Sequence, residues 1–277
     1  MSTNTVALTA PAKLTLSLRI VGVRDDGYHL IDAEMVTLDL HDVVTIDPTG
    51  DGVTVTGRYA AGVPTDRRNL AVRALGDRRA GITIDKRIPH GGGLGGGSSD
   101  AAAVLRWAGH ADHPIDPDAL ANAALLGADV AFCLLGGRAR VRGIGEVVEP
   151  LPHLDRHVTL VIPPLRVSTP AAYRAWDELG GPTAPGPNDL EPAALSIEPE
   201  LARWRERIGD ATGREPVLAG SGATWFVHGE HGNALAALGN EGAEIIAART
   251  TRAPSDQREA GSSSIEQAGR RQSDRLR

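Results

Sequence analysis

The sequence has only one cysteine, Cys133, among its 277 residues. A single cysteine cannot build an internal disulfide framework or a cysteine-based zinc site, and it is typical of a protein kept in a reducing compartment. No stretch approaches the roughly 18 apolar residues of a membrane span, and residues 1–10 lack the basic and apolar regions of an export signal. We therefore expect a cytoplasmic protein with no membrane partner.

The sequence also lacks an excess of positive charge, since 29 Lys and Arg residues against 35 Asp and Glu residues give a net charge of −6. Aromatic residues make up only 3% of the chain, and they form no basic, aromatic stripe. Both absences argue against a nucleic-acid partner. An anionic ligand must therefore be held by local geometry. We expect the protein to be a monomer or a weak homodimer.

The spacing of apolar residues predicts an α+β protein with two domains, 1–153 and 154–251. The first 60 residues are predicted to be mostly β, broken into short strands at Gly, Asp and Pro. Further strands are predicted over 81–85, 158–162 and 225–227, a hairpin over 136–148, and helices over 69–79, from 99 onward, 117–126, 169–179, 200–208 and 234–238. The polar segment 252–277 is predicted to be a disordered tail.

The most informative segment is a glycine-rich loop between a predicted strand and a predicted alanine-rich helix. Glycines allow successive N–H groups to point at one anion, and a helix N-terminus adds partial positive charge. No lysine follows the glycines, so this is not a Walker A loop, and no βαβ repetition supports a dinucleotide fingerprint. A flexible linker is the alternative to an ATP phosphate loop. The residues predicted to bind the nucleotide are Pro89, His90, Gly91, Gly92, Gly93, Leu94, Gly95, Gly96, Gly97, Ser98 and Ser99.

Three further segments accompany the loop: Pro-Ala-Lys-Leu at 11–14, Leu-Gly-Ala-Asp-Val-Ala-Phe at 126–132 and Leu-Ala-Gly-Ser-Gly-Ala-Thr at 218–224. Together they resemble the GHMP kinase superfamily. Arg-Asp-Asp-Gly-Tyr-His-Leu at 24–30 and Asn-Asp-Leu-Glu-Pro at 188–192 are similar to signatures of the 4-diphosphocytidyl-2-C-methyl-D-erythritol kinases within it. The resemblance runs from residue 6 to about residue 251. It implies a two-domain GHMP kinase fold, with an N-terminal domain like ribosomal protein S5 domain 2 and a ferredoxin-like C-terminal domain.

The resemblance also implies an activity. It would be transfer of the γ-phosphoryl group of ATP, with Mg²⁺, to the 2-hydroxyl of 4-diphosphocytidyl-2-C-methyl-D-erythritol, in the non-mevalonate route to isoprenoid precursors. Two alternatives stay open: another GHMP kinase acting on homoserine, mevalonate or a sugar, and a non-catalytic relative that senses a ligand. No set of metal ligands stands out in the sequence.

Lys13 and Asp129 match the catalytic pair of the family. Phosphoryl transfer needs an oriented hydroxyl, a route for its proton and positive charge near the migrating group. Asp129 would accept the proton, and Lys13 would hold the carboxylate and stabilise charge at the reacting oxygen. Taken alone, Asp129 is more typical of a helix cap and Lys13 of a solvated lysine, and it is the combination of motifs that favours the catalytic roles.

The remaining predicted site residues would hold the acceptor. Tyr28 would stack on the cytosine, His29 would hydrogen-bond to its edge, and Tyr173 would offer a second aromatic face, although each could instead be a packing residue. The residues predicted to complete this site are Thr15, Gly220, Ser221 and Gly222. Thr15 stands where the family often has Asn, and Ala131 where Pro is common. Asn188 and Asp189 could simply cap a helix.

Overall fold

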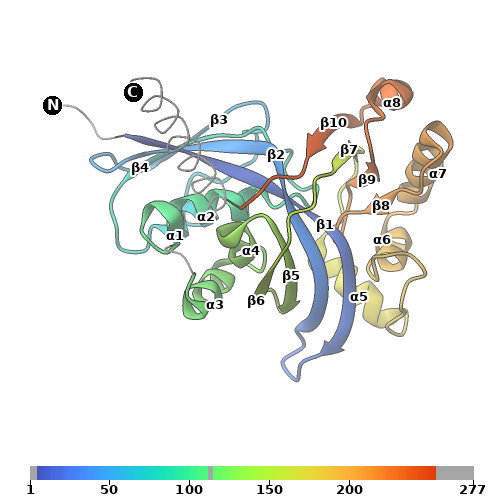
Figure 1. Cartoon of the computed structure of the whole chain (residues 1–277), viewed down its shortest axis with the longest axis horizontal. Helices are drawn as coiled ribbons and strands as arrows, with labels where there is room; N and C mark the ends of the chain where they lie inside the picture. Colours follow the sequence, from blue (N-terminus) through green and yellow to red (C-terminus); the bar gives the residue numbers. More distant parts are fainter. Residues whose placement is uncertain (1–4, 112–114, 254–277) are drawn as a thin grey trace, which may run out of the picture.

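The computed structural model describes residues 5–111 and 115–253, which form two lobes, each with its own β-sheet (Figure 1). The first sheet has the strand order β3-β4-β2-β5-β6, with β1 paired to the opposite edge of β2. Its pairings are antiparallel except for β3 with β4, which are parallel. Its strands are β1 (Val6–Val23), β2 (His29–Asp47), β3 (Val53–Thr56), β4 (Gly81–Asp85), β5 (Arg138–Gly143) and β6 (Val147–Leu151).

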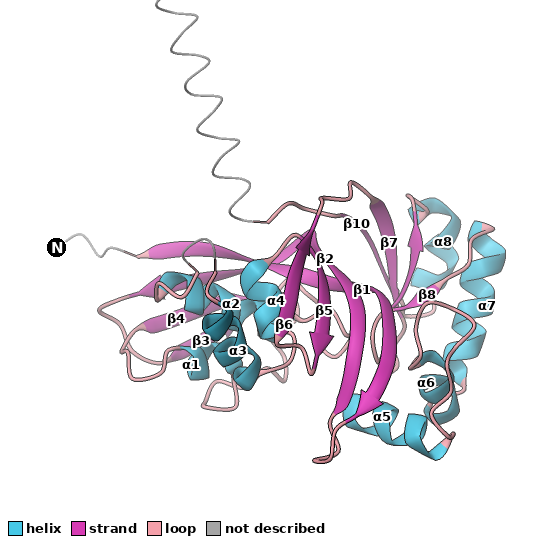
Figure 2. Ribbon diagram, turned by 60° about the horizontal axis from the view of Figure 1, so that its bottom comes forward, coloured by secondary structure: helices cyan, strands magenta, loops and turns pink. Residues whose placement is uncertain are grey.

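β1 and β2 are long, curved strands where the sequence predicted several short ones (Figure 2). The breaks that were expected at Pro11 and its neighbours are irregularities within one ladder. The register of β1 against β2 shifts between Pro11 and Lys13, between Thr15 and Ser17, and between Ile20 and Gly22. A proline lacks an N–H and is tolerated at such bulges, which bend the strand without ending it.

Four helices cover the first sheet: α1 (Leu70–Ala74), α2 (Gly96–Trp107), α3 (Pro117–Leu126) and α4 (Val130–Leu135). α1 is shorter than predicted, because Leu75 ends it and Gly76 takes a positive φ of 60°. α2 begins three residues earlier than expected, since Gly95 in the left-handed region serves as its N-cap. α3 was predicted with its correct bounds and is capped by Asp116.

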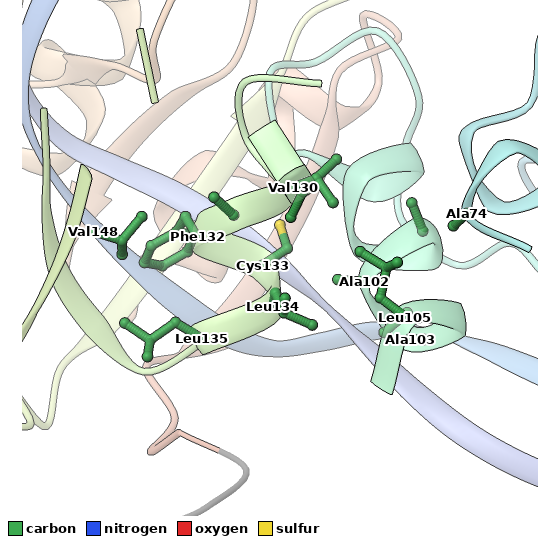
Figure 3. Packing of buried hydrophobic residues seen from close by; sticks show 14 of the residues in the cluster. Ala74, Ala102, Ala103, Leu105, Val130, Phe132, Cys133, Leu134, Leu135 and Val148 are labelled. Carbon is green, nitrogen blue, oxygen red and sulfur yellow. The ribbon is translucent and has the colours of Figure 1, made fainter. Parts of the chain in front are cut away.

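α4 was not predicted. All six of its residues are buried, so its sequence carries no contrast between an apolar and a polar face. Figure 3 shows the reason: the helix lies between α2, which contributes Ala102 and Leu105, and β6, which contributes Val148. This packing fixes the position of the residue that precedes α4, Asp129.

The second lobe is a four-stranded antiparallel sheet in the order β10-β7-β9-β8. Two helical segments connect its strands in the sequence order βαββαβ, which is the ferredoxin-like arrangement, so the predicted fold class is confirmed. β10 was not predicted; only Ala248 of its six residues is buried, and its sequence does not alternate between apolar and polar residues. The elements are β7 (His157–Ile162), α5 (Thr169–Glu178), α6 (Glu191–Ile197), α7 (Glu200–Thr212), β8 (Val217–Leu218), β9 (Trp225–His228), α8 (Gly232–Gly239) and β10 (Glu244–Arg249).

The two lobes share a hydrophobic core. Its members come from β1 and β2 of the first sheet, from β7, β9 and β10 of the second, and from both glycine turns: Ala12, Leu14, Val36, Leu38, Ile88, Leu94, Val158, Leu160, Ala219, Phe226 and Ala248. The Thr37 and Thr251 hydroxyls, 3.0 Å apart, add a polar link beside this core. Close packing of this kind fixes the loop around Leu94 against the turn around Ala219.

Within the described ranges, no helix has the length and apolar character needed to cross a membrane. Cys133, on α4, is buried. Residues 254–277, which make up nearly all of the predicted disordered tail, lie outside the described residues.

Candidate active site

A cavity of about 730 Å³ lies between the lobes and gathers most of the predicted acceptor and catalytic residues. They come from both long strands, from the turn before α4, from α5 and from the turn between β8 and β9. The predicted residues that line it are Lys13, Thr15, Tyr28, His29, Asp129, Tyr173, Gly220 and Ser221. Segments far apart in the sequence therefore meet at one cavity.

Lys13 and Asp129 form an ion pair in this cavity. The Lys13 Nζ atom lies 3.3 Å from Asp129 Oδ2 and donates a hydrogen bond to Thr15 Oγ1 at 3.1 Å. The Lys13 side chain is 6% exposed and that of Asp129 is 31% exposed, so the carboxylate is the member of the pair that a ligand can reach. Asp129 occupies the N-cap position of α4 but makes no capping hydrogen bond, so helix capping does not account for its side chain.

The glycine-rich loop rests directly on Lys13. The Lys13 backbone N–H donates to the Leu94 carbonyl at 3.0 Å. Gly95 has a φ of +68°, and a Cβ added there would lie 2.6 Å from Lys13 Cγ. Only glycine allows this approach.

The loop encloses a second cavity of about 230 Å³ at the N-terminus of α2. Gly91, Gly93 and Gly95 all have positive φ angles, which lets the backbone curl around the space. Backbone N–H groups at a helix start form a cradle for an anion, so the residues present fit a nucleotide's phosphates. Its predicted lining residues are Pro89, His90, Gly91, Gly93, Leu94, Gly95, Gly96, Gly97 and Ser98, and Gly93 also lines the larger cavity.

Three predicted residues line neither cavity. The Ser99 hydroxyl is buried and donates to the Pro11 carbonyl, so it points away from the loop. A Cβ on Gly92 would lie 2.7 Å from Thr224 Oγ1, and one on Gly222 would touch Leu218. These three residues support the walls of the two cavities without lining them.

Aromatic side chains surround His29 at the far end of the larger cavity. The rings of His29 and Tyr173 are 4.7 Å apart, and Trp176 approaches the His29 ring edge-on at 5.5 Å. Asp177 Oδ1 lies 2.9 Å from His29 Nε2. Trp176 and Asp177 were not predicted from the sequence, although both lie within one helical turn of Tyr173 and therefore on its face of α5.

The two tyrosines differ in environment. Tyr28 is 58% exposed at the rim, with the Arg24 guanidinium 5.5 Å from its ring centroid. Burial raises the pKa of Tyr173 to about 12, and the charge of Asp129 adds to this effect. Tyr173 therefore stays neutral and can present an uncharged ring face to a ligand.

Asn188 and Asp189 do not cap a helix: Asn188 holds the second glycine turn within the second lobe, and Asp189 contacts β1 of the first lobe. The Asn188 amide donates to the carbonyls of Leu218 at 2.8 Å and Gly220 at 2.7 Å. Asp189 accepts from Arg19 Nη1 at 2.6 Å and from the Ile20 N–H at 3.0 Å. The second glycine turn and β1 are thus held by the segment that precedes α6.

A buried cluster of charges, also missed from the sequence, lies beneath the glycine-rich loop. Lys86 Nζ contacts a carboxylate oxygen of Asp42 and lies 2.7 Å from Asp100 Oδ2. Burial raises the pKa of Asp100 to about 7, opposed by Lys86 and reinforced by Asp42. For Lys86, burial acts to lower the pKa, but the two carboxylates outweigh burial and hold it above its usual value.

Comparison with known proteins agrees with this geometry. Residues 67–137 match the model of the GHMP kinases N terminal domain. The 4-diphosphocytidyl-2-C-methyl-D-erythritol kinase of Paracoccus denitrificans (strain Pd 1222) is 41% identical over 238 residues, covering 78% of this chain and 84% of that enzyme. This chain belongs to the same kinase family. The predicted family and the predicted enzyme class, an ATP-dependent kinase, are confirmed.

Solved structures lead to the same family. A crystal structure of 4-(cytidine 5'-diphospho)-2C-methyl-D-erythritol kinase is 35% identical, with a TM-score of 0.72, and covers 88% of this chain and 99% of that chain. A homoserine kinase from Cytophaga hutchinsonii, 17% identical with a TM-score of 0.61 over 91% of this chain and 96% of its own, shares the fold.

The chain departs from the kinase family's pattern at Thr15 and at Ala131. Thr15, where Asn is frequent, accepts the hydrogen bond from Lys13 and so retains an orienting contact. Ala131, where Pro is common, is buried in the first turn of α4. The Asp129 carbonyl still accepts the Cys133 N–H at 3.0 Å, so the turn after Asp129 is ordered by the helix itself.

Proposed function

We propose that this kinase transfers the γ-phosphoryl group of ATP to the 2-hydroxyl of 4-diphosphocytidyl-2-C-methyl-D-erythritol. The products would be the 2-phosphate and ADP, in the non-mevalonate route to isoprenoid precursors. One observation carries the proposal: Asp129 and His29 line a single cavity that meets the glycine-rich loop at Gly93. The acceptor hydroxyl, its nucleobase and the nucleotide phosphates therefore each have a place in one continuous site.

The proposed chemistry follows from the ion pair. The Asp129 carboxylate accepts the proton of the acceptor hydroxyl, because it is the more exposed member of the pair. Lys13 keeps that carboxylate in position and places a positive charge beside the reacting oxygen. The N–H groups of the loop hold the phosphates, which aligns the γ-phosphoryl group with the hydroxyl.

Mg²⁺ would balance the phosphate charges of the bound nucleotide. Across residues 5–111 and 115–253, no group of three or more His, Cys, Asp or Glu side chains could hold a metal. We therefore propose that the ion is held chiefly by the phosphates and by water, as Mg²⁺ in kinases often is.

The nucleobase would lie between aromatic faces. Tyr173 provides a neutral, partly buried ring beside His29, and Tyr28 provides an exposed ring at the rim. The imidazole of His29 would hydrogen-bond to the polar edge of the base. Gly220 and Ser221 would contact the middle of the acceptor from the second lobe.

We further propose that the chain forms two domains, 1–153 and 154–251, and that the protein is cytoplasmic. We also propose that it has no nucleic-acid partner and is a monomer or a weak dimer. Analytical ultracentrifugation over a range of protein concentrations tests the oligomeric state. An RNA-binding assay at low salt tests the absence of a nucleic-acid partner, because electrostatic association is strongest there.

The direct test is a coupled assay of ADP release with Mg·ATP. The acceptors compared are 4-diphosphocytidyl-2-C-methyl-D-erythritol, homoserine, mevalonate and galactose, each with the wild-type protein and with Asp129→Ala. ADP release with the cytidyl acceptor alone, lost in the variant, supports the proposal. Release with a different acceptor would keep the kinase chemistry but overturn the base site, and no release with any of them would overturn the proposed reaction.

A further inference from the structure

The sequence contains only two lysines, Lys13 and Lys86, among its 29 basic residues. All the others are arginines, whose planar guanidinium is wider than the compact ammonium group of lysine. Both lysines are buried and both are paired with aspartates. Lys13 belongs to the proposed catalytic pair, whereas the function proposed above assigns no role to Lys86.

Lys86 connects the two ends of the glycine-rich loop. It directly follows β4, on the side where the chain enters the loop, and Asp100 lies in α2, where the chain leaves it. Lys86 Nζ is 2.7 Å from Asp100 Oδ2, and both side chains are 2% exposed. One buried ion pair therefore spans the loop from its entrance to its exit.

Asp42, on β2, ties the same cluster to the sheet. One of its carboxylate oxygens contacts Lys86 Nζ, and the other accepts the backbone N–H groups of Arg87 at 2.5 Å and Ile88 at 2.8 Å. These two residues directly precede the loop. The side chain of Asp42 is fully buried, so its carboxylate cannot reach water. These contacts supply the hydrogen bonds that water would otherwise give to it.

The cluster reaches the floor of the phosphate cavity. Lys86 is one of the residues that line the small cavity. A Cβ added to Gly96, the first residue of α2, would lie 3.1 Å from Lys86 Nζ and 3.4 Å from Asp42 Oδ2. The ammonium group therefore lies against the first turn of α2, whose N–H groups face the cavity.

We propose that Lys86, clamped between Asp42 and Asp100, is a positioning residue that sets the spacing between the two ends of the glycine-rich loop and thereby its affinity for a nucleoside triphosphate. The proposal rests on the proposed function of the loop. Lys86 acts through the backbone of the loop, and its own ammonium group stays on the two aspartates. Arginine cannot take its place, because the guanidinium is wider than the ammonium and Gly96 leaves no room for it.

The test compares steady-state kinetics of the wild-type kinase with those of Lys86→Met/Asp100→Asn. The second substitution removes one of the two buried carboxylates that would otherwise lose their cation, and Asp42 keeps the backbone N–H groups of Arg87 and Ile88. We expect the KM for Mg·ATP to rise about tenfold or more, with kcat and the KM of the acceptor within about twofold of wild type. Asp100→Asn alone keeps an oxygen for Lys86 and is expected to leave the KM for Mg·ATP within about threefold of wild type.

Arg138→Met is the matched control, because it removes a partly buried ion pair, with Glu34, that lies outside both cavities. It is expected to lower the melting temperature without changing the KM for Mg·ATP. If the double variant lowers only the melting temperature, as this control does, the positioning role is overturned. If the double variant does not fold, Lys86→Gln replaces it, and an unchanged KM for Mg·ATP in that variant overturns the proposal equally. A failure of the proposed function would appear earlier, as absent turnover by the wild-type protein.

Discussion

His29 Nε2 lies 2.9 Å from Asp177 Oδ1, so the nitrogen of the ring that faces α5 is held by a carboxylate. A carboxylate only accepts hydrogen bonds, so it favours the imidazole form with a proton on Nε2. In the tautomer with its proton on Nε2, Nδ1 carries a lone pair and can accept a hydrogen bond from an exocyclic amine. In the proposed acceptor site, this contact would therefore decide which hydrogen-bonding pattern the His29 ring offers to the base.

Asp177→Asn should therefore weaken acceptor binding with little effect on turnover. An amide can donate as well as accept, so it no longer fixes the proton on Nε2. Asp177 is half exposed, and we expect the KM for the cytidyl acceptor to rise only about three- to tenfold, with kcat nearly unchanged. Glu178→Gln, the neighbouring exposed acid, serves as control, and equal KM values for both variants would contradict the role of Asp177.

Asp129→Asn should abolish most turnover while nucleotide binding persists. The amide cannot take up the hydroxyl proton, and loss of a general base typically costs about 10²- to 10⁴-fold in rate. Because Asp129 lines only the larger cavity, the affinity for ATP should change little. Single-turnover phosphoryl transfer and equilibrium nucleotide binding measure the two effects separately. Turnover within a few fold of wild type would contradict the assignment.

Gly95→Ala should impair catalysis more than stability. An alanine Cβ at this position would lie 2.6 Å from Lys13 Cγ, so the lysine must move away from Asp129. We expect kcat to fall about tenfold or more, since small misplacements of catalytic groups are costly. Gly109→Ala is the control, because Gly109 also has a positive φ, of 86°, but has open space around it. Both variants should lose roughly 1 kcal/mol of stability, and equal kcat values for the two would contradict the prediction.

Asp100→Asn should change how the stability of the protein depends on pH. Burial raises the pKa of Asp100 to about 7, above its value of about 4 in an unfolded chain. Between those values the folded state binds the extra proton, so this group's contribution to stability is present below about pH 4 and is lost as the pH rises through about 7. Asn carries no titrating proton, so the variant should gain stability relative to wild type as the pH rises from about 4 to about 7. Urea unfolding at several pH values measures this difference, and a constant difference would contradict the prediction.

The sequence singles out Lys13 and Asp129, which the structure brings together, because both lie in short, contiguous motifs. Lys13 follows Pro-Ala, and Asp129 follows Gly-Ala, so each is recognisable without knowledge of the fold. The hairpin at 136–148 and helices α3 and α5 were predicted for a related reason, since local periodicity and caps determine them. The distance between Lys13 and Asp129, in contrast, depends on the whole sheet.

The features that were missed depend on contacts between distant residues. Asp42 lies on β2, Lys86 follows β4 and Asp100 lies in α2, so the contacts among them form only in the folded protein. α4 is uniformly apolar, so its periodicity is invisible, and β1 continues through Pro11 because a bulge absorbs the missing N–H. The rarity of lysine was the one signal in the sequence that could have singled out Lys86.

The core shared by both sheets has an evolutionary consequence. Leu14 and Leu38 of the first lobe are buried together with Leu160 and Phe226 of the second, so exchange of one lobe alone would leave mismatched apolar surfaces in this core. Recombination of whole modules is therefore a costly route to a new acceptor. Substitutions around the cavity and changes in the length of its rim leave the core intact, and the exposed turn that carries Tyr28 has room for such variation.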